Sequence, residues 1–173
     1  FEAIAAEELR DLVPGTTEHS TRSIADKNGM LLFNYAGDPQ DLFELRTVED
    51  IFIQVARIPN LPPSVAGLRM LRDITLSAQI EPALQIARQI APGRGGRGRI
   101  RFRVVSRQVG RTAYRRVDAQ NTVERAIMAR SDHRWGLEQE GALEFWLTLL
   151  PKEAILALRL SDERMRHREY KFE

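Results

Sequence analysis

Residues 99–105 read RIRFRVV, and this stretch decides the expected fold. Charged and apolar residues alternate in it with the period of two that a half-buried β-strand requires. Arg99, Arg101 and Arg103 therefore share one face of the predicted strand, at a spacing of ~6.6 Å. The other face is apolar and anchors the strand to a core; it consists of Ile100, Phe102 and Val104.

Helical patterns lie on both sides of this strand in the sequence. Ser64 is a suitable N-cap for a helix over residues 64–77, and a second helix is expected over residues 81–90. Asp118 is expected to cap a third helix, over residues 118–130. The remaining expected elements are strands over residues 135–139, 143–150 and 154–160.

The first sixty residues suggest a separate unit. Asn28-Gly29 supplies the positive φ angles of a tight hairpin turn. Helical spacing predicts an inner helix face made of Phe1, Ile4, Ala5, Leu9 and Leu12. The expected order is a helix over 1–13, strands over 18–24 and 30–35, a short helix ending near Leu45, and a strand over 47–58. This is the order of a ferredoxin-like unit that lacks its first strand.

The segment Asn60-Leu61-Pro62-Pro63 is the best candidate for a linker, because proline restricts both itself and the residue before it. The predicted fold class is therefore α+β, with one domain over residues 1–60 and an α/β domain over 61–160. Residues 161–173 are charged and show no core-forming period, so they are predicted to be a linker.

Charge is distributed very unevenly along the 173 residues, although the net charge is only +2. Residues 1–60 carry a net charge of −6, residues 61–117 one of +10, and residues 118–173 one of −2. All ten basic residues between Pro82 and Val117 are arginine, and no acid interrupts them. Such a block favours one basic surface with an anionic partner, most often a nucleic acid.

The candidate RNA-binding residues are arginines in and around the predicted strand. Guanidinium groups suit phosphate contacts, and Tyr114 could add a surface for base stacking. Two alternatives remain: the acidic first third neutralises the basic block, or the arginines only keep an edge strand soluble. The candidate set is Arg94, Arg97, Arg99, Arg101, Arg103, Arg107, Arg111, Arg115 and Arg116.

Several other kinds of site are not expected. The stretch Gly93–Gly98 satisfies G-x-G-x-x-G, but a helix precedes it and a strand follows, the reverse of a dinucleotide or methyl-donor site. It is therefore predicted to be a flexible loop whose arginines reach phosphates. The sequence has no cysteine, no metal-ligand spacing, no catalytic motif and no membrane-length apolar run. A cytoplasmic protein without an active site in these residues is expected.

Four segments resemble THUMP-domain RNA methyltransferases. They are the opening residues 1–12, residues 30–46 with Phe33, Gly37 and Asp38 followed by Leu45-Arg46-Thr47, residues 102–127 with Phe102-Arg103-Val104 and Arg107, and the closing pattern Arg168-Glu169-Tyr170-Lys171. The match at residues 33–38 has two residues extra. The resemblance covers nearly the whole chain, although its motifs are short.

The resemblance implies a ferredoxin-like N-terminal domain, a THUMP domain and a linker to a catalytic domain that is not among these residues. The chain would then bind tRNA or rRNA and position it for an S-adenosylmethionine-dependent methyltransferase domain in the same protein. No cofactor is expected in the chain itself. The alternative is a protein-interaction scaffold whose basic face docks an acidic partner; a complete stand-alone enzyme is the third possibility.

Overall fold

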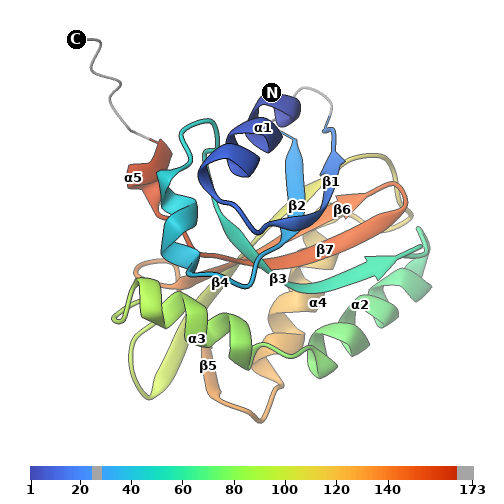
Figure 1. Ribbon diagram of the computed structural model, residues 1–173. Helices are drawn as coiled ribbons and strands as arrows, with labels where there is room; N and C mark the ends of the chain where they lie inside the picture. Colours follow the sequence, from blue (N-terminus) through green and yellow to red (C-terminus); the bar gives the residue numbers. More distant parts are fainter. Residues whose placement is uncertain (25–28, 167–173) are drawn as a thin grey trace. The chain divides into compact units, whose positions relative to one another are not determined.

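The computed structural model describes residues 1–24 and 29–166, and it confirms the α+β class (Figure 1). The chain divides into two units. Unit 1 comprises Phe1–Ile51 and the segment from Leu160 onward, and unit 2 comprises Phe52–Arg159. Every one of the nine candidate arginines lies in unit 2.

Unit 2 is built on a five-stranded sheet with the order β3-β7-β6-β4-β5. β4 lies inside the sheet, parallel to β6 on one side and to β5 on the other. β7 runs antiparallel to both β6 and β3. The strands are β3 (Phe52–Pro59), β4 (Arg99–Gln108), β5 (Arg134–Leu137), β6 (Leu143–Leu150) and β7 (Glu153–Arg159).

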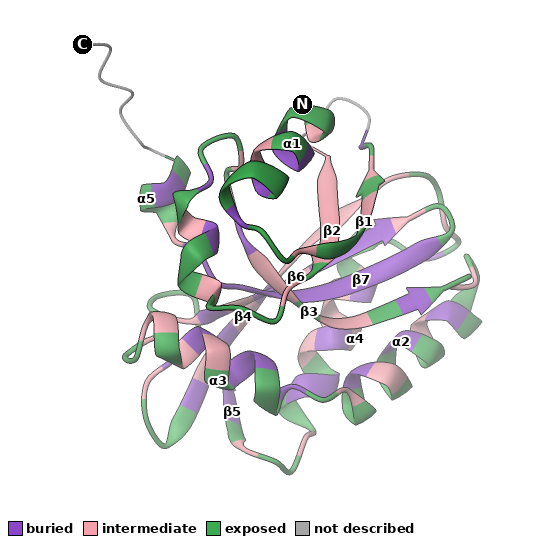
Figure 2. Cartoon of the chain, in the orientation of Figure 1, coloured by how far each residue is buried: buried purple, intermediate pink, exposed green. Residues whose placement is uncertain are grey.

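The helices of unit 2 are α2 (Val65–Ser77), α3 (Glu81–Ile90) and α4 (Arg116–Met128), and Figure 1 shows them together on one side of the sheet. α4 packs against β4 and β5. The core between sheet and helices includes edge-to-face contacts of Phe102 with Trp135 and Phe145. Figure 2 shows the burial along β7, all of whose residues are buried.

Unit 1 contains α1 (Glu2–Leu12), the antiparallel hairpin of β1 (Thr17–Arg22) and β2 (Met30–Asn34), the 3₁₀ helix η1 (Pro39–Glu44) and α5 (Glu163–Arg166). The expected opening helix and hairpin strands are thus present. The hairpin turn at Asn28-Gly29 and the pattern Arg168–Lys171 lie at least partly outside the described residues.

The inner face predicted for the first helix is partly wrong. Phe1, Ile4 and Leu12 are exposed, with Phe1 96% exposed. The buried residues of α1 are Ala5, Ala6 and Leu9. Small alanines at two of these three positions allow close packing, which a count of large apolar residues does not detect.

Polar contacts connect distant segments of unit 1. The Glu8 carboxylate accepts hydrogen bonds from the backbone N–H groups of Arg46 and Thr47, at 2.8 and 2.9 Å. Asp50 accepts a hydrogen bond from Ser161 and forms an ion pair with Arg166. The start of the expected linker is therefore part of unit 1.

One expected strand and one expected helix start at residues other than those predicted. The strand expected over residues 47–58 begins at Phe52, and it pairs with β7 in unit 2 instead of completing the N-terminal unit. Asp118 is not the cap of its helix: Arg115 is the N-cap, and Asp118 occupies the third helical position. Its carboxylate accepts a hydrogen bond from the Arg115 backbone N–H at 3.0 Å. Asp118 thus provides a partner for the N-cap backbone from a position within the first turn of the helix.

Candidate nucleic-acid interface

The alternation predicted for β4 is confirmed. Ile100, Phe102 and Val104 are at most 5% exposed and point toward the core. Arg99 is exposed on the other face, and Arg101 and Arg103 are partly exposed there. The idea of an edge strand at the sheet margin is wrong, because β5 pairs with β4 on its outer side.

The candidate arginines lie near the two opposite ends of β4. Arg99 and Arg107 are eight residues apart on β4, which corresponds to ~26 Å in an extended strand. We therefore distinguish an amino-end group from a carboxyl-end group. The amino-end group consists of Arg94, Arg97, Arg99 and Arg101, and the carboxyl-end group of Arg107, Arg111, Arg115 and Arg116.

Arg103, between the two groups, is partly neutralised by an acid from the next strand, which it shares with Arg159. Its guanidinium lies 2.8 Å from the Glu144 carboxylate of β6, and Arg159 of β7 binds the other Glu144 oxygen at 2.8 Å. Burial raises the pKa of Glu144, but hydrogen bonds from Arg159 and Arg103 outweigh it, so this pKa lies below its ordinary value. The stretch from Pro82 to Val117 has no acid in its sequence, but Arg103 thus has an acidic neighbour in space.

Glycines shape the surroundings of the amino-end group. A Cβ atom added at Gly136 of β5 would lie 2.0 Å from Arg99 Nε, so the Arg99 side chain occupies the space that a larger residue would fill. Cβ atoms at Gly96 and Gly141 would lie 3.3 and 3.5 Å from nitrogens of the Arg101 guanidinium. Arg99 and Arg101 therefore both lie against backbone that has no side chain.

The Gly93–Gly98 loop is held in place at two points, which its interpretation as a flexible loop did not foresee. The Gly95 N–H donates to the Gly141 carbonyl at 3.1 Å, and the Arg101 N–H donates to the Gly95 carbonyl at 2.8 Å. Gly95, Gly96 and Gly98 have φ near +79°, which glycine adopts without steric cost.

The same loop does not fit a methyl-donor cofactor. A Cβ atom at Gly95 would lie 2.9 Å from Leu143 Cγ, and Gly96 faces Arg101, so side chains already occupy the space beside these two glycines. The loop also precedes a strand, whereas a phosphate-binding glycine turn precedes a helix.

Arg134 belongs to the amino-end group in space, although the sequence analysis missed it. Arg134 is the register partner of Arg99 in the parallel pair of β5 and β4, and Gly136 is that of Arg101. Paired residues project from the same face, so Arg134 lies beside Arg99. The strand expected over residues 135–139 starts one residue earlier in the structure, at Arg134, so the expected bounds left this arginine out.

Three members of the carboxyl-end group make contacts within the protein. Arg107 donates from Nε to Thr148 at 2.9 Å, with its guanidinium carbon 5.7 Å from the centre of the Trp146 ring. Arg116 donates to the Ser106 hydroxyl at 2.6 Å, and Arg115 forms an ion pair with Asp118 at 2.9 Å. The Arg115 hydrogen bond lowers the pKa of Asp118 and raises the pKa of Arg115.

Tyr114 does not provide the stacking surface considered above, because it is 7% exposed. Its ring packs near Gly67 of α2, where an added Cβ atom would lie 3.4 Å from Tyr114 Cε1. Burial raises the pKa of the Tyr114 phenol above its ordinary value. A base cannot reach this ring.

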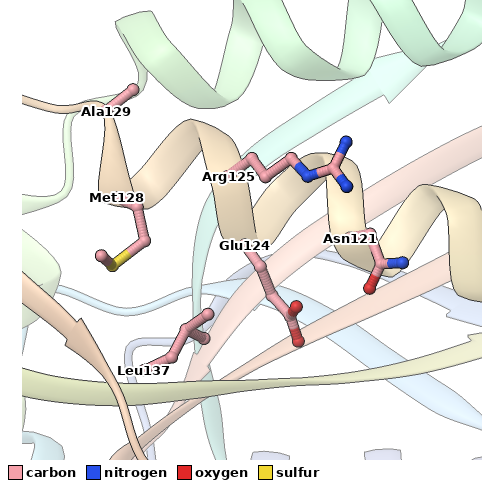
Figure 3. A pocket seen from close by; sticks show the side chains of 6 residues that line it. All are labelled: Asn121, Glu124, Arg125, Met128, Ala129 and Leu137. Atoms are coloured by element: carbon pink, nitrogen blue, oxygen red, sulfur yellow. The ribbon is translucent and has the colours of Figure 1, made fainter.

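A shallow hollow lies between α4 and β5 (Figure 3). Leu137, which contributes to it, is the register partner of the buried Phe102 and so lies on the helix side of the sheet. Among the described residues, no three histidine or acidic side chains come together as a metal site would require. The hollow is lined by Asn121, Glu124, Arg125, Met128, Ala129 and Leu137.

None of the helices described here combines the length and the apolar character needed to cross a membrane.

Solved structures share this fold. TrmN from Thermus thermophilus matches 93% of this chain and 42% of its own, with a TM-score of 0.67 and 20% identity. A predicted N6-adenine-specific DNA methylase from Listeria monocytogenes str. 4b F2365 matches 91% of this chain and 37% of its own, with a TM-score of 0.56 and 18% identity. SMU.472, a putative methyltransferase solved as a complex with SAH, matches 91% of this chain and 38% of its own, with a TM-score of 0.55 and 17% identity.

No protein-family profile and no curated protein sequence matches the chain. At these identities the structural likeness establishes the fold alone, which this chain shares with a part of each of these structures. The chain spans less than half the length of each of these three structures.

Proposed function

We propose that this chain is an RNA-binding module of a methyltransferase, with unit 2 as a THUMP-type domain that contacts tRNA or rRNA. Its role is to hold the RNA for an S-adenosylmethionine-dependent catalytic domain in the same polypeptide. Unit 1 would be the accompanying ferredoxin-like N-terminal domain. The protein would act in the cytoplasm.

One observation carries the proposal: arginines without a neutralising acid project from one end of the sheet. Among the described residues, no carboxylate forms an ion pair with Arg97, Arg99, Arg101 or Arg134. Charges in this position attract phosphates, and phosphate contacts fix the position of a nucleic acid without reading its sequence. The likeness to methylase structures supports a nucleic acid as the anion.

Salt dependence of RNA binding tests this function. Fluorescence anisotropy with a labelled tRNA and a labelled rRNA hairpin should give affinities that fall steeply as salt rises. If five arginines contact phosphates, the log–log slope is expected to be about −3.5 to −4.5. Absence of RNA binding at low salt would overturn the proposal.

The same assay separates RNA binding from docking of an acidic protein. An unlabelled tRNA should displace the labelled RNA, and polyglutamate of equal charge should compete much less. The reverse order of competition would favour the protein-interaction scaffold. Equilibrium dialysis should show no uptake of S-adenosylmethionine by this chain, because its glycine loop does not fit the cofactor.

A further inference from the structure

We propose that Arg99, Arg101 and Arg134 form a pre-organised site for successive backbone phosphates of one nucleic-acid strand. We call these three residues the phosphate corner. This assignment rests on the proposed RNA-binding function and narrows it from a broad basic surface to one end of two parallel strands. It also gives Gly136, Gly96 and Gly141 a role as positioning residues.

The corner differs from Arg103 and Arg115 in its lack of a carboxylate partner within the protein. Arg103 shares Glu144 with Arg159, and Arg115 is paired with Asp118. The described residues offer no such partner to Arg99, Arg101 or Arg134. Their positive charge therefore remains available to a ligand.

Glycine backbone holds two of the three side chains in place. The space above Gly136 is filled by the Arg99 side chain, and the Arg101 guanidinium rests against Gly96 and Gly141. An exposed arginine usually loses rotamer freedom when it binds a ligand, which costs affinity. Packing against backbone reduces this cost before the ligand arrives.

The spacing of the corner suits a chain of phosphates. The backbone positions of Arg99 and Arg101 are ~6.6 Å apart along β4. Arg134 is the register partner of Arg99 on the neighbouring strand, whose backbone lies ~4.8 Å away. Successive phosphates along a nucleic-acid strand have a similar separation. Each planar guanidinium can donate two parallel hydrogen bonds to one phosphate, which an ammonium group cannot do.

Most aromatic side chains of unit 2 are buried, and the two that are partly exposed are Phe52 and Trp146. None of its six aromatic side chains is fully exposed: they are Phe52, Phe102, Tyr114, Trp135, Phe145 and Trp146. Single-strand binding proteins generally stack bases on exposed rings. Recognition at the corner is thus directed at phosphates and is independent of sequence.

Charge-removing variants give the first test, with the full chain and a fluorescein-labelled RNA hairpin at about 0.1 M salt. Arg101→Ala and Arg134→Ala should each weaken binding about tenfold, the effect of losing a charge-assisted bidentate contact. Arg69→Ala, which removes one exposed charge from α2, is the matched control and should change affinity less than twofold. Equal losses in all three variants would show that only overall charge matters and would overturn the corner.

A charge-neutral variant gives the sharper test. Gly136→Ala keeps every charge but displaces the flexible end of Arg99, and it should weaken binding about threefold or more. Unchanged affinity in a folded Gly136→Ala protein would overturn the pre-organised site. Should circular dichroism show that this variant is unfolded, Arg99→Lys replaces it. That variant keeps the positive charge but loses the planar guanidinium, so unchanged affinity for RNA would again overturn the proposal.

The results distinguish a failure of the proposed function from a failure of the phosphate corner. If the unmodified chain binds no RNA, the proposed function fails; if it binds RNA but the corner variants match the control, only the present inference fails. The hairpin is also compared with and without a 5′-phosphate. Equal affinities are expected for backbone phosphates, and dependence on the terminal phosphate would overturn that assignment.

Discussion

Arg101 and Arg103 project from the same face of β4, two residues apart, but they have different neighbours. Arg101 lies against glycines, whereas Arg103 is 2.8 Å from Glu144. Arg103→Ala is expected to lower stability by about 1 kcal/mol, since the pair is partly exposed, and to lower the melting temperature by about 3 °C. Thermal unfolding should show this loss for Arg103→Ala and not for Arg101→Ala.

RNA binding should show the opposite order. Arg101→Ala should flatten the log–log salt slope, and Arg103→Ala should flatten it less, because the Arg103 guanidinium is held at Glu144, a carboxylate that it shares with Arg159. Equal flattening in both variants would contradict this division of roles.

Glu144 makes stability depend on pH in a definite direction. Its pKa is lower in the folded protein than in the unfolded chain, so its stabilising effect is complete above the ordinary glutamate value of about 4.3. This stabilisation is lost as the pH falls through the lower pKa that Glu144 has in the folded protein. Glu144→Gln should therefore be less stable than the original chain at pH 7, by about 2 kcal/mol, and this gap should close as the solution is acidified.

Urea unfolding of both proteins at several pH values measures that gap. A gap that stayed constant down to pH 3 would show that the Glu144 charge does not stabilise the fold.

At the scale of elements, Arg130 connects the region after α4 to the end of α2. Its guanidinium donates to the Thr75 and Leu76 carbonyls at 2.8 and 3.1 Å, and Asp132 binds it at 2.7 Å. A cation at a helix C-terminus satisfies carbonyls that have no partner within the helix. Arg130→Ala should lower stability by about 1–2 kcal/mol and speed amide exchange in the last turn of α2.

Arg125→Ala is the control for this cap, since Arg125 of α4 is exposed and its loss should have little effect. Equal amide exchange in the original chain and in Arg130→Ala would show that α2 does not depend on the cap.

The sequence revealed local elements much better than their pairing. Alternation in residues 99–105 predicted which side chains of β4 are buried, because that property depends only on the strand period. It could not reveal Glu144 beside Arg103 or Arg134 beside Arg99, because those neighbours depend on strand order and register. The contact of Arg130 with Thr75 likewise joins residues 55 positions apart.

At the scale of the whole molecule, strand pairing places the start and the end of unit 2 side by side. Phe52 and Arg159 are register partners of β3 and β7. Unit 2 is therefore one continuous segment inserted between two segments of unit 1. The boundary expected at Pro62 and its neighbours falls after β3, since proline marks the break between β3 and α2 and not the break between the units.

This arrangement predicts how fragments of the chain behave. A fragment of residues 52–159 retains all five strands and all the candidate arginines, so it should fold alone and bind RNA with the salt slope of the full chain. A fragment of residues 61–160 lacks β3, which leaves one side of β7 without its hydrogen-bonding partner and exposes buried apolar residues. We expect it to melt at a lower temperature or to aggregate.

Circular dichroism and amide-resolved NMR spectra of the two fragments measure the difference, with the full chain as reference. Equal stability of both fragments would mean that β3 contributes little to unit 2. A folded 52–159 fragment without RNA affinity would instead show that unit 1 supplies contacts to the nucleic acid, which the position of the arginines does not predict.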